Sequence, residues 1–174
     1  METDLERILT NSYKAEMISH LKSHPEDFEE AIILAVSDKQ PYSQKAAWLL
    51  WSCMEENDPR IQGYIKRIIE TLKVTGDSQL RDLLIILEKM ELDENIQGEL
   101  FEICVDVWEK IGKKASLRYN AFKLIVKTAN KYPELYNEVK YLTQDQYTDS
   151  FSKTAQKSIF KMISELETYL KIRK

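Results

Sequence analysis

The chain has 174 residues but only 4 Gly and 4 Pro, so turns are few and the elements between them are long. This composition argues against a many-stranded sandwich or barrel, and it leaves no glycine-rich loop that could hold a phosphate. Apolar residues make up 43% of the chain and the net charge is only -4, which excludes a disordered polyelectrolyte.

The N-terminal sequence METDLERILT carries acidic residues where a secretory signal needs a basic start followed by a long apolar stretch. The longest apolar block, residues 83–87, is far shorter than the roughly 18 residues that a membrane span needs. We therefore expect a soluble, cytoplasmic protein.

Apolar residues recur at helical spacing along almost the whole chain, and no segment has the alternation of a strand. Asp58 and Asp93 stand where helix N-caps are expected, each directly before an amphipathic segment. After a short lead-in at Asp4–Leu9, the predicted helices cover Ser12–Ser23, a segment that begins at Pro25, Pro41–Asn57, Asp58–Leu72, Gly76–Met90, Asp93–Ile111, Lys114–Lys131, Pro133–Leu142 and Asp149–Ile172.

Several of these segments are apolar on most sides, which is typical of helices packed between neighbours. The side chains expected in the core are Trp48, Leu50, Leu84, Leu87 and Ile125.

Basic residues recur just inside alternate predicted helices. Lys45, Arg81 and Arg118 are separated by 36 and 37 residues, and Lys157 follows after a further 39. Two helices in each interval of this length indicate stacked helical hairpins, because a single hairpin cannot bury its apolar face alone.

The segments around these basic residues resemble HEAT and armadillo repeats, whose units often carry Arg-x-x-Ala near a helix start. Ser116-Leu117-Arg118-Tyr119-Asn120-Ala121 matches best, and Ser43-Gln44-Lys45-Ala46-Ala47-Trp48 is a weaker match. The resemblance covers roughly residues 25–172. It implies an all-α, right-handed α-solenoid of four to five hairpins in one domain over residues 1–174, with units at about 4–37, 41–73, 77–111, 114–142 and 149–172.

The Ser43–Trp48 stretch is also similar to one in small bacterial HEAT-like proteins, some of which are labelled adenylosuccinate lyases. That lyase family is far longer and uses a glycine-rich signature loop with His acid–base residues. This chain has no such loop, so the resemblance does not extend to that activity.

Charge is distributed unevenly along the chain. Residues 1–109 hold 11 Lys and Arg against 23 Asp and Glu, whereas residues 110–174 hold 14 against 6. Two lysine rows, each at i, i+4, i+8, lie in the basic part, although like charges at this spacing cost a helix a few tenths of a kcal/mol per pair. The candidate partner-binding residues are these two rows, Lys123, Lys127, Lys131 and Lys153, Lys157, Lys161, together with Arg118.

Each candidate has a plainer interpretation. The lysine rows could be a solvated surface or an intermolecular match for the acidic part of the chain. Arg118 lies on the apolar face of its helix and is either an anion hook or, as we favour, an internal tie between helix ends.

No catalytic or metal-binding set is apparent. His20 and His24 are spaced i, i+4, but no third ligand stands at a useful local spacing. Cys53 and Cys104 lie in apolar helical patterns and are expected to be small core residues. We therefore expect no metal and no cofactor.

The sequence thus favours a non-enzymatic scaffold or adaptor that binds another macromolecule. The expected partner is a protein of acidic character, and we expect no membrane binding. The alternative is a nucleic-acid-binding protein or enzyme similar to the alkylpurine DNA glycosylases built from HEAT-like repeats. The acidic first 109 residues argue against that alternative, since they would repel a phosphate backbone. The sequence does not indicate an oligomeric state.

Overall fold

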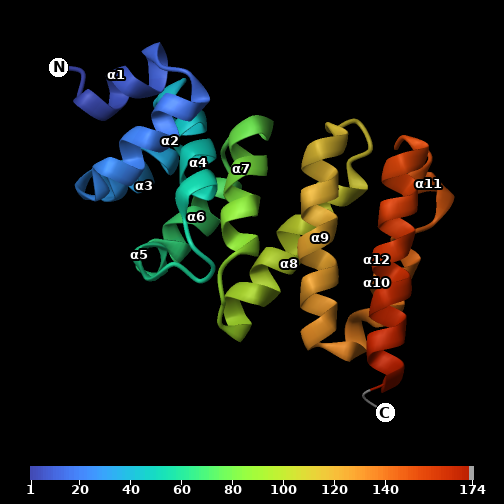
Figure 1. The fold of residues 1–174 in the computed structure, drawn as a ribbon. Coiled ribbons are helices and arrows are strands. Elements are labelled where there is room, and N and C mark those ends of the chain that lie inside the picture. Colours follow the sequence, from blue (N-terminus) through green and yellow to red (C-terminus); the bar gives the residue numbers. More distant parts are fainter. Residues whose placement is uncertain (173–174) are drawn as a thin grey trace. The chain divides into compact units, whose positions relative to one another are not determined.

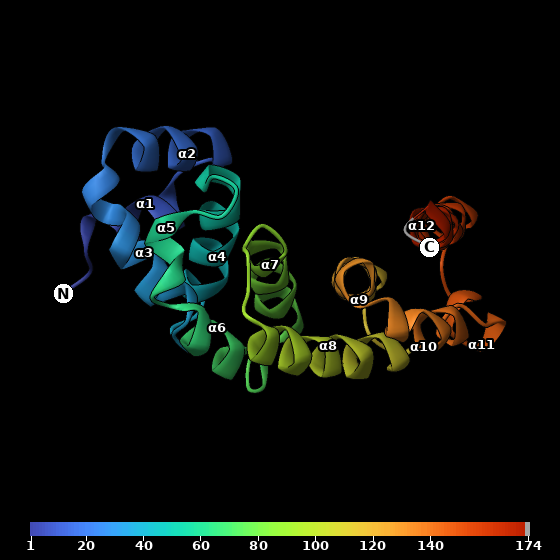
Figure 2. The same cartoon turned by 90° about the horizontal axis from the view of Figure 1, so that it is seen from below.

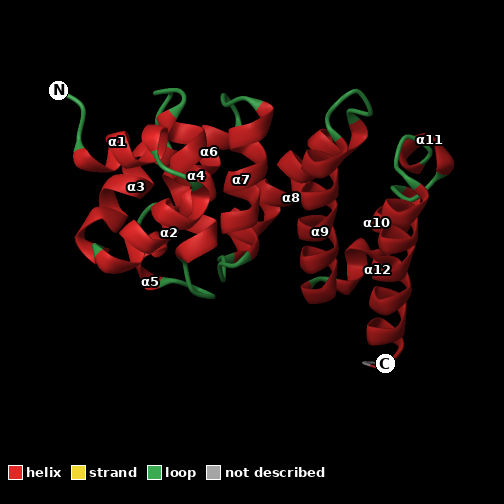
Figure 3. Cartoon of the chain, turned by 45° about the horizontal axis from the view of Figure 1, so that its top comes forward, coloured by secondary structure: helices red, strands yellow, loops and turns green. Residues whose placement is uncertain are grey.

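The structure is a computed structural model that describes residues 1–172. Helices joined by short turns make up this part of the chain, and no strand occurs within it (Figure 3). The all-α fold class expected from the sequence is therefore confirmed. The same residues include no helix that is long and apolar enough to cross a membrane.

The chain divides into two compact units, the first being Met1–Leu92 (Figure 1). In this unit α4 packs against both α3 and α7, and α6 packs against α7. Its helices are α1 (Asp4–Asn11), α2 (Lys14–Ser23), the 3-10 turn η1 (Pro25–Asp27), α3 (Phe28–Ala35), α4 (Tyr42–Cys53), α5 (Pro59–Gln62), α6 (Ile65–Leu72) and α7 (Asp77–Glu88).

The second unit begins at Asp93. Within it α9 packs against α8 on one side and α12 on another, and α9 and α12 run side by side, as Figures 1 and 2 show. Its helices are α8 (Glu94–Glu109), α9 (Ala115–Lys131), the 3-10 turn η2 (Pro133–Leu135), α10 (Tyr136–Tyr141), α11 (Asp145–Thr148) and α12 (Lys153–Ile172). The organisation of the whole chain as one domain stays a prediction.

Two predicted helices differ from those observed. The segment Asp58–Leu72 is divided into α5 and α6 at Gly63 and Tyr64. Glycine weakens a helix interior, so a break costs least there. The last helix begins at Lys153 rather than Asp149, because Ser152 acts as a start signal: its hydroxyl accepts a hydrogen bond from the Ala155 amide at 3.2 Å.

The two predicted aspartate caps are confirmed. The Asp58 carboxylate accepts a hydrogen bond from the Arg60 amide, and the Asp93 carboxylate accepts one from the Ile96 amide. Each satisfies an amide that the first turn of a helix leaves without a partner. Local sequence is therefore sufficient to locate the starts of α5 and α8.

Four of the five residues expected in the core are buried: Leu50, Leu84, Leu87 and Ile125. Trp48 is not buried. It lies half-exposed on α4, with the Lys14 ammonium 4.9 Å from its ring centroid. An indole beside a lysine can keep one face toward solvent and still be stabilised, so the apolar surroundings of Trp48 in the sequence were misleading.

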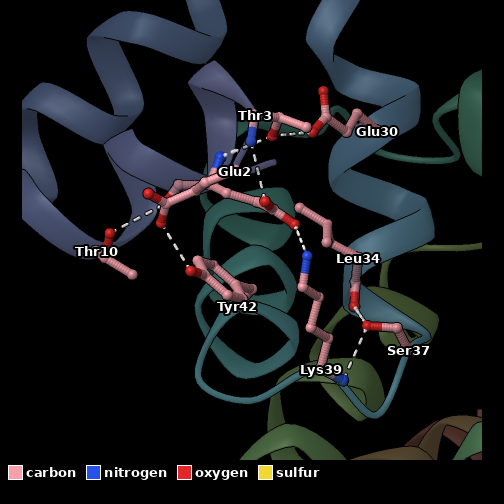
Figure 4. A network of polar contacts seen from close by, with 9 residues as sticks. Glu2, Thr3, Thr10, Glu30, Leu34, Ser37, Lys39 and Tyr42 are labelled. Atoms are coloured by element: carbon pink, nitrogen blue, oxygen red, sulfur yellow. Dashed lines mark hydrogen bonds and ion pairs between the residues drawn. The ribbon is translucent and has the colours of Figure 1, made fainter.

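A polar network fixes the N-terminus to α3 and α4 (Figure 4). Thr3 and Glu6 form a reciprocal capping box at the start of α1, in which the Thr3 amide donates to Glu6 Oε2 at 3.0 Å. The Lys39 ammonium also donates to the buried Glu6 carboxylate, and the Tyr42 hydroxyl donates to Glu2 at 2.7 Å. The hydrogen bonds from Lys39 and then from the Thr3 amide hold the pKa of Glu6 below its usual value.

Replacing Leu84 by Ala should lower the free energy of unfolding by roughly 2–5 kcal/mol, because it leaves a cavity in a fully buried position of α7. Urea unfolding followed by circular dichroism measures the effect. The matched control is Ile33→Ala on α3, where the side chain is 44% exposed and the loss should be far smaller. Equal losses for the two variants would show that α7 is not central to its unit.

Replacing Glu6 by Gln should destabilise the first unit at neutral pH. A carboxylate whose pKa is lowered in the folded state stabilises that state above its unfolded pKa, and this contribution disappears as pH falls through the folded pKa. The melting temperatures of Glu6→Gln and the unmodified chain should therefore differ at pH 7 and converge below about pH 4. Glu26→Gln, at an exposed position, serves as the control and should follow the unmodified chain at every pH. A difference that persists unchanged at low pH would contradict this assignment.

Candidate functional site

Arg118 lies inside the second unit, with only 1% of its surface exposed. Its Nε donates to the Trp108 carbonyl at 2.8 Å and its Nη2 to the Tyr147 carbonyl at 2.7 Å, while Nη1 donates to the Ser150 hydroxyl at 2.8 Å. These acceptors belong to the end of α8, to α11 and to the turn between α11 and α12. One side chain therefore joins three parts of the chain.

No carboxylate of the described residues pairs with Arg118. Its guanidinium instead lies 4.7 Å from the ring centroids of both Trp108 and Phe151. Burial lowers the pKa of Arg118, but two carbonyls near helix C-termini and two aromatic faces offer partial negative charge to the cation. Arg118 is thus an internal tie, and because it is buried it does not belong to the candidate partner-binding surface.

Two glutamines in the first turns of other helices also donate hydrogen bonds to backbone carbonyls. Gln79 of α7 donates from Nε2 to the Ala35 and Ser37 carbonyls at 2.8 and 3.0 Å. Gln156 of α12 donates from Nε2 to the Thr148 and Phe151 carbonyls at 3.1 and 3.0 Å. Each glutamine binds carbonyls of a loop or helix end near its own helix.

The basic residues of the 36- to 39-residue period are therefore not equivalent in the structure. Arg118 is buried, whereas Lys45 is half-buried, the Arg81 side chain is one-third exposed and Lys157 is exposed. The period correctly marks the first turns of α4, α7, α9 and α12, which we call the inner helices. In α7 and α12 the side chain that binds backbone carbonyls is a glutamine one or two residues before the basic residue of the period.

The two lysine rows lie on neighbouring helices, α9 and α12, in the second unit. The Tyr119 hydroxyl on α9 and the Ser158 hydroxyl on α12 form a 2.7 Å hydrogen bond where these helices meet. Lys123 follows Tyr119 by one turn, and Lys161 follows Ser158 by one turn, so the rows flank this bond on one side of the unit. We call the six residues Lys123, Lys127, Lys131, Lys153, Lys157 and Lys161 the lysine surface.

Five of the six lysines are exposed and Lys123 is half-buried. On the opposite sides of the two helices, Ile125, Ala129, Ile159 and Ile163 are buried, as their spacing predicts. Lys161 lies 3.7 Å from Glu165, and the Lys131 ammonium donates to the Gln97 side chain at 2.9 Å. Five of the six predicted lysines are therefore accessible to solvent, on two helices that pack against each other.

Acidic residues are missing from the helices of the lysine surface over most of their length. The α9 sequence contains no Asp or Glu, and the first acidic residue of α12 is Glu165. Phe160 of α12 lies one turn after Lys157 and is 45% exposed. The surface thus combines clustered lysines with an accessible aromatic ring, a combination that suits contact with a protein.

A second polar cluster lies in the first unit and was not predicted from the sequence. Asp82 of α7 is fully buried, and its Oδ1 accepts hydrogen bonds from Trp51 Nε1 at 3.1 Å and from Arg81 Nη2 at 3.0 Å. Its Oδ2 is buried without a hydrogen-bond partner among the described residues. Burial, the largest influence, raises the pKa of Asp82 against the opposing effect of Arg81. The available signal in the sequence was an acidic residue on the buried stripe of an apolar helix.

Asp58 shows how the same unit accommodates another buried carboxylate. Both of its oxygens are used: Oδ1 accepts from the Arg60 amide and Nε, and Oδ2 accepts from the Glu55 amide at 3.1 Å and Arg60 Nη2 at 2.7 Å. These hydrogen bonds, those of the Arg60 side chain first, lower the pKa of Asp58. Compared with Asp58, Asp82 is incompletely paired.

The remaining candidates from the sequence do not form a reactive site in the described residues. His20 Nε2 lies 2.8 Å from Asp27 Oδ2, and its ring stacks on His24 with centroids 4.3 Å apart. Residues 1–172 contain no group of three His, Cys, Asp or Glu side chains that could hold a metal ion. Cys53 is half-buried and Cys104 is buried, each as a free thiol.

A family model described as HEAT repeat domain matches residues 1–166. No curated protein and no solved structure gives a significant match.

Replacing Arg118 by Lys should lower the free energy of unfolding of the second unit by about 2–4 kcal/mol, because an ammonium cannot reach all three acceptors and buried acceptors are left unpaired. Urea unfolding of this variant tests the expectation. The same exchange at the exposed Arg67 is the matched control and should change stability by less than about 0.5 kcal/mol. If Arg118→Lys is as stable as the control, Arg118 is not a structural tie.

Proposed function

The chain belongs to the HEAT repeat domain family, and we propose that it is a non-enzymatic scaffold whose lysine surface binds an acidic segment of another protein. Family membership confirms the HEAT-like resemblance and fold class, and a repeat scaffold is what this fold provides. The observation that carries the proposal is the pair of lysine rows on one side of α9 and α12, with no acidic residue on α9.

The arrangement of charge supports a binding surface over an ordinary solvated one. Lysines spaced i, i+4 repel one another, so two parallel rows do not stabilise their own helices. A cluster of positive charge attracts an acidic partner and accelerates encounter. Successive lysines of a row rise by about 6 Å along the helix, a spacing that acidic side chains at i, i+4 of a partner helix can match.

A protein partner agrees with the surface better than a nucleic acid does. The six side chains are lysines, and none of them is an arginine that could bind a phosphate through two parallel hydrogen bonds. The exposed Phe160 offers apolar contact to a protein side chain.

The test uses the full chain and two labelled probes of equal negative charge. One is an amphipathic peptide with Glu at every fourth position and Leu between, and the other is a short duplex DNA. We expect saturable binding of the peptide in fluorescence anisotropy, with an affinity that falls several-fold as salt rises to about 0.15 M, where the Debye length is about 8 Å. Tighter binding of the DNA would favour the nucleic-acid alternative.

The decisive variant replaces Lys127, Lys153 and Lys157 by Gln, all of which are exposed, and leaves the half-buried Lys123 unchanged. It should weaken peptide binding by about tenfold or more, while the melting temperature stays equal or rises slightly because like-charge repulsion is reduced. A second variant with Lys22, Lys66 and Arg67 replaced by Gln removes the same charge from exposed positions of the first unit and should bind normally. If both variants bind the peptide equally well, the lysine surface is only solvated.

A further inference from the structure

The part of the lysine surface that α12 contributes has a simple pattern. Lys153, Lys157 and Phe160 follow one another at i, i+4 and i+7, so they project from the same side of the helix. Both lysines are exposed, and the Phe160 side chain is 45% exposed. The first acidic residue of α12, Glu165, comes about two turns after Lys157. These three residues, which we call the α12 face, present two positive charges followed by an apolar side chain.

The first unit has the opposite pattern on η1 and α3. Glu26, Glu29 and Ile33 follow one another at i, i+3 and i+7, which also places them on one side of their segment. Both glutamates are exposed, and the Ile33 side chain is 44% exposed. Residues 25–38 contain five acidic residues and no Lys or Arg. We call Glu26, Glu29 and Ile33 the acidic face.

The fold leaves the charge of the acidic face available to a partner. The Tyr64 hydroxyl donates to Glu29, but a hydroxyl is uncharged and the carboxylate stays negative. Within residues 1–172 neither Glu26 nor Glu29 forms an ion pair. The acidic residues of α8 differ, since Asp106 pairs with Lys110 at 2.6 Å and no apolar side chain of α8 is exposed beside them.

The two faces are complementary in charge and in spacing. Residues of a helix rise by about 1.5 Å each, so both patterns extend over roughly 10 Å. When the two segments lie side by side in the same direction, each lysine faces a glutamate and Phe160 faces Ile33. The ion pairs favour this arrangement over others, and contact between the two apolar side chains removes both from water. Both faces are exposed in the single chain, so a second copy can pair with each of them.

We propose that the acidic segment bound by the lysine surface is the acidic face of a second copy of this chain, an inference that rests on the proposed function of that surface. The contact uses different faces of the two copies, so each copy keeps one face on which a further copy can bind. Two short helical faces bury less than the roughly 1,200 Å² of stable complexes. Association is therefore weak, reversible and sensitive to salt.

Sedimentation velocity of the full chain at several protein concentrations tests for this association. At about 0.02 M salt the weight-average sedimentation coefficient should rise with protein concentration. At about 0.15 M salt, where the Debye length is about 8 Å, the rise should be several-fold smaller. A coefficient that does not change with concentration at low salt would overturn the proposal.

Charge reversal identifies the two faces. Lys153→Glu together with Lys157→Glu makes both faces acidic, and Glu26→Lys together with Glu29→Lys makes both faces basic. Each double variant alone should sediment as a monomer, because like charges then meet. An equimolar mixture of the two should associate again, since each acidic face can meet a basic one. Melting temperatures show whether both variants are folded, and a mixture of folded variants that stays monomeric contradicts the pairing.

The apolar residues test the pairing without a change of charge. Phe160→Ser and Ile33→Ser should each weaken self-association several-fold and leave its salt dependence in place, because the ion pairs remain. These variants also avoid the hydrogen bond between Tyr64 and Glu29, so they decide the matter if Glu29→Lys is poorly folded. Unchanged association in both serine variants would show that the two faces do not meet.

The matched control reverses two exposed acidic residues of α8. Glu94→Lys together with Glu102→Lys should associate like the unmodified chain, because neither residue belongs to the acidic face. If this variant, rather than the one altered at Glu26 and Glu29, loses self-association, the acidic segment lies on α8 and the assignment to the acidic face is wrong.

The Glu-rich peptide probe separates this proposal from the function on which it rests. The variant with Glu26→Lys and Glu29→Lys keeps its lysine surface but lacks the competing acidic face, so it should bind the peptide at least as tightly as the unmodified chain. If the unmodified chain binds the peptide but does not self-associate, the lysine surface is a binding surface whose partner is not a second copy. Loss of both peptide binding and self-association would contradict both proposals.

Discussion

The Arg118 guanidinium donates hydrogen bonds from the interior of the second unit to the carbonyls of Trp108 and Tyr147, which lie at or near the ends of α8 and α11. Backbone carbonyls at helix ends have no partner within their own helix, and a fold built of short hairpins has many such ends near its core. Gln79 and Gln156 meet the same requirement at α7 and α12 with neutral amides. α7, α9 and α12 thus each have, in the first turn, a long side chain that donates hydrogen bonds to such carbonyls. Pairing these carbonyls is the recurring constraint that lets the hairpins pack.

This constraint also decides which side of each inner helix meets solvent. With Arg118 and the apolar residues of α9 directed into the unit, the lysines on the remaining arc lie on the outside or at its edge. The hydrogen bond between Tyr119 and Ser158 holds α12 beside α9 on that side. The lysine surface is thus a consequence of packing two helices whose inward faces are fully used.

The first unit presents a different surface on its inner helices. In place of lysines, α4 exposes part of Trp48 and Trp51, and α7 contributes Asp82 at the junction. Asp58 is paired through both oxygens and Asp82 through one.

The sequence by itself determined the all-α class, the starts of α5 and α8, the burial of residues such as Leu84 and Ile125, and the outward direction of Lys127 and Lys157. Helical periodicity and capping are local, so neighbouring residues suffice to read them. Tertiary structure decided what depends on distant partners. Trp48 lies half-exposed beside the ammonium of Lys14 from α2, and Arg118 is an internal tie because α8 and α11 place carbonyls around it. The incomplete pairing of Asp82 likewise became visible only once α4 and α7 were side by side, since the hydrogen bonds of a buried carboxylate come from whichever helices surround it.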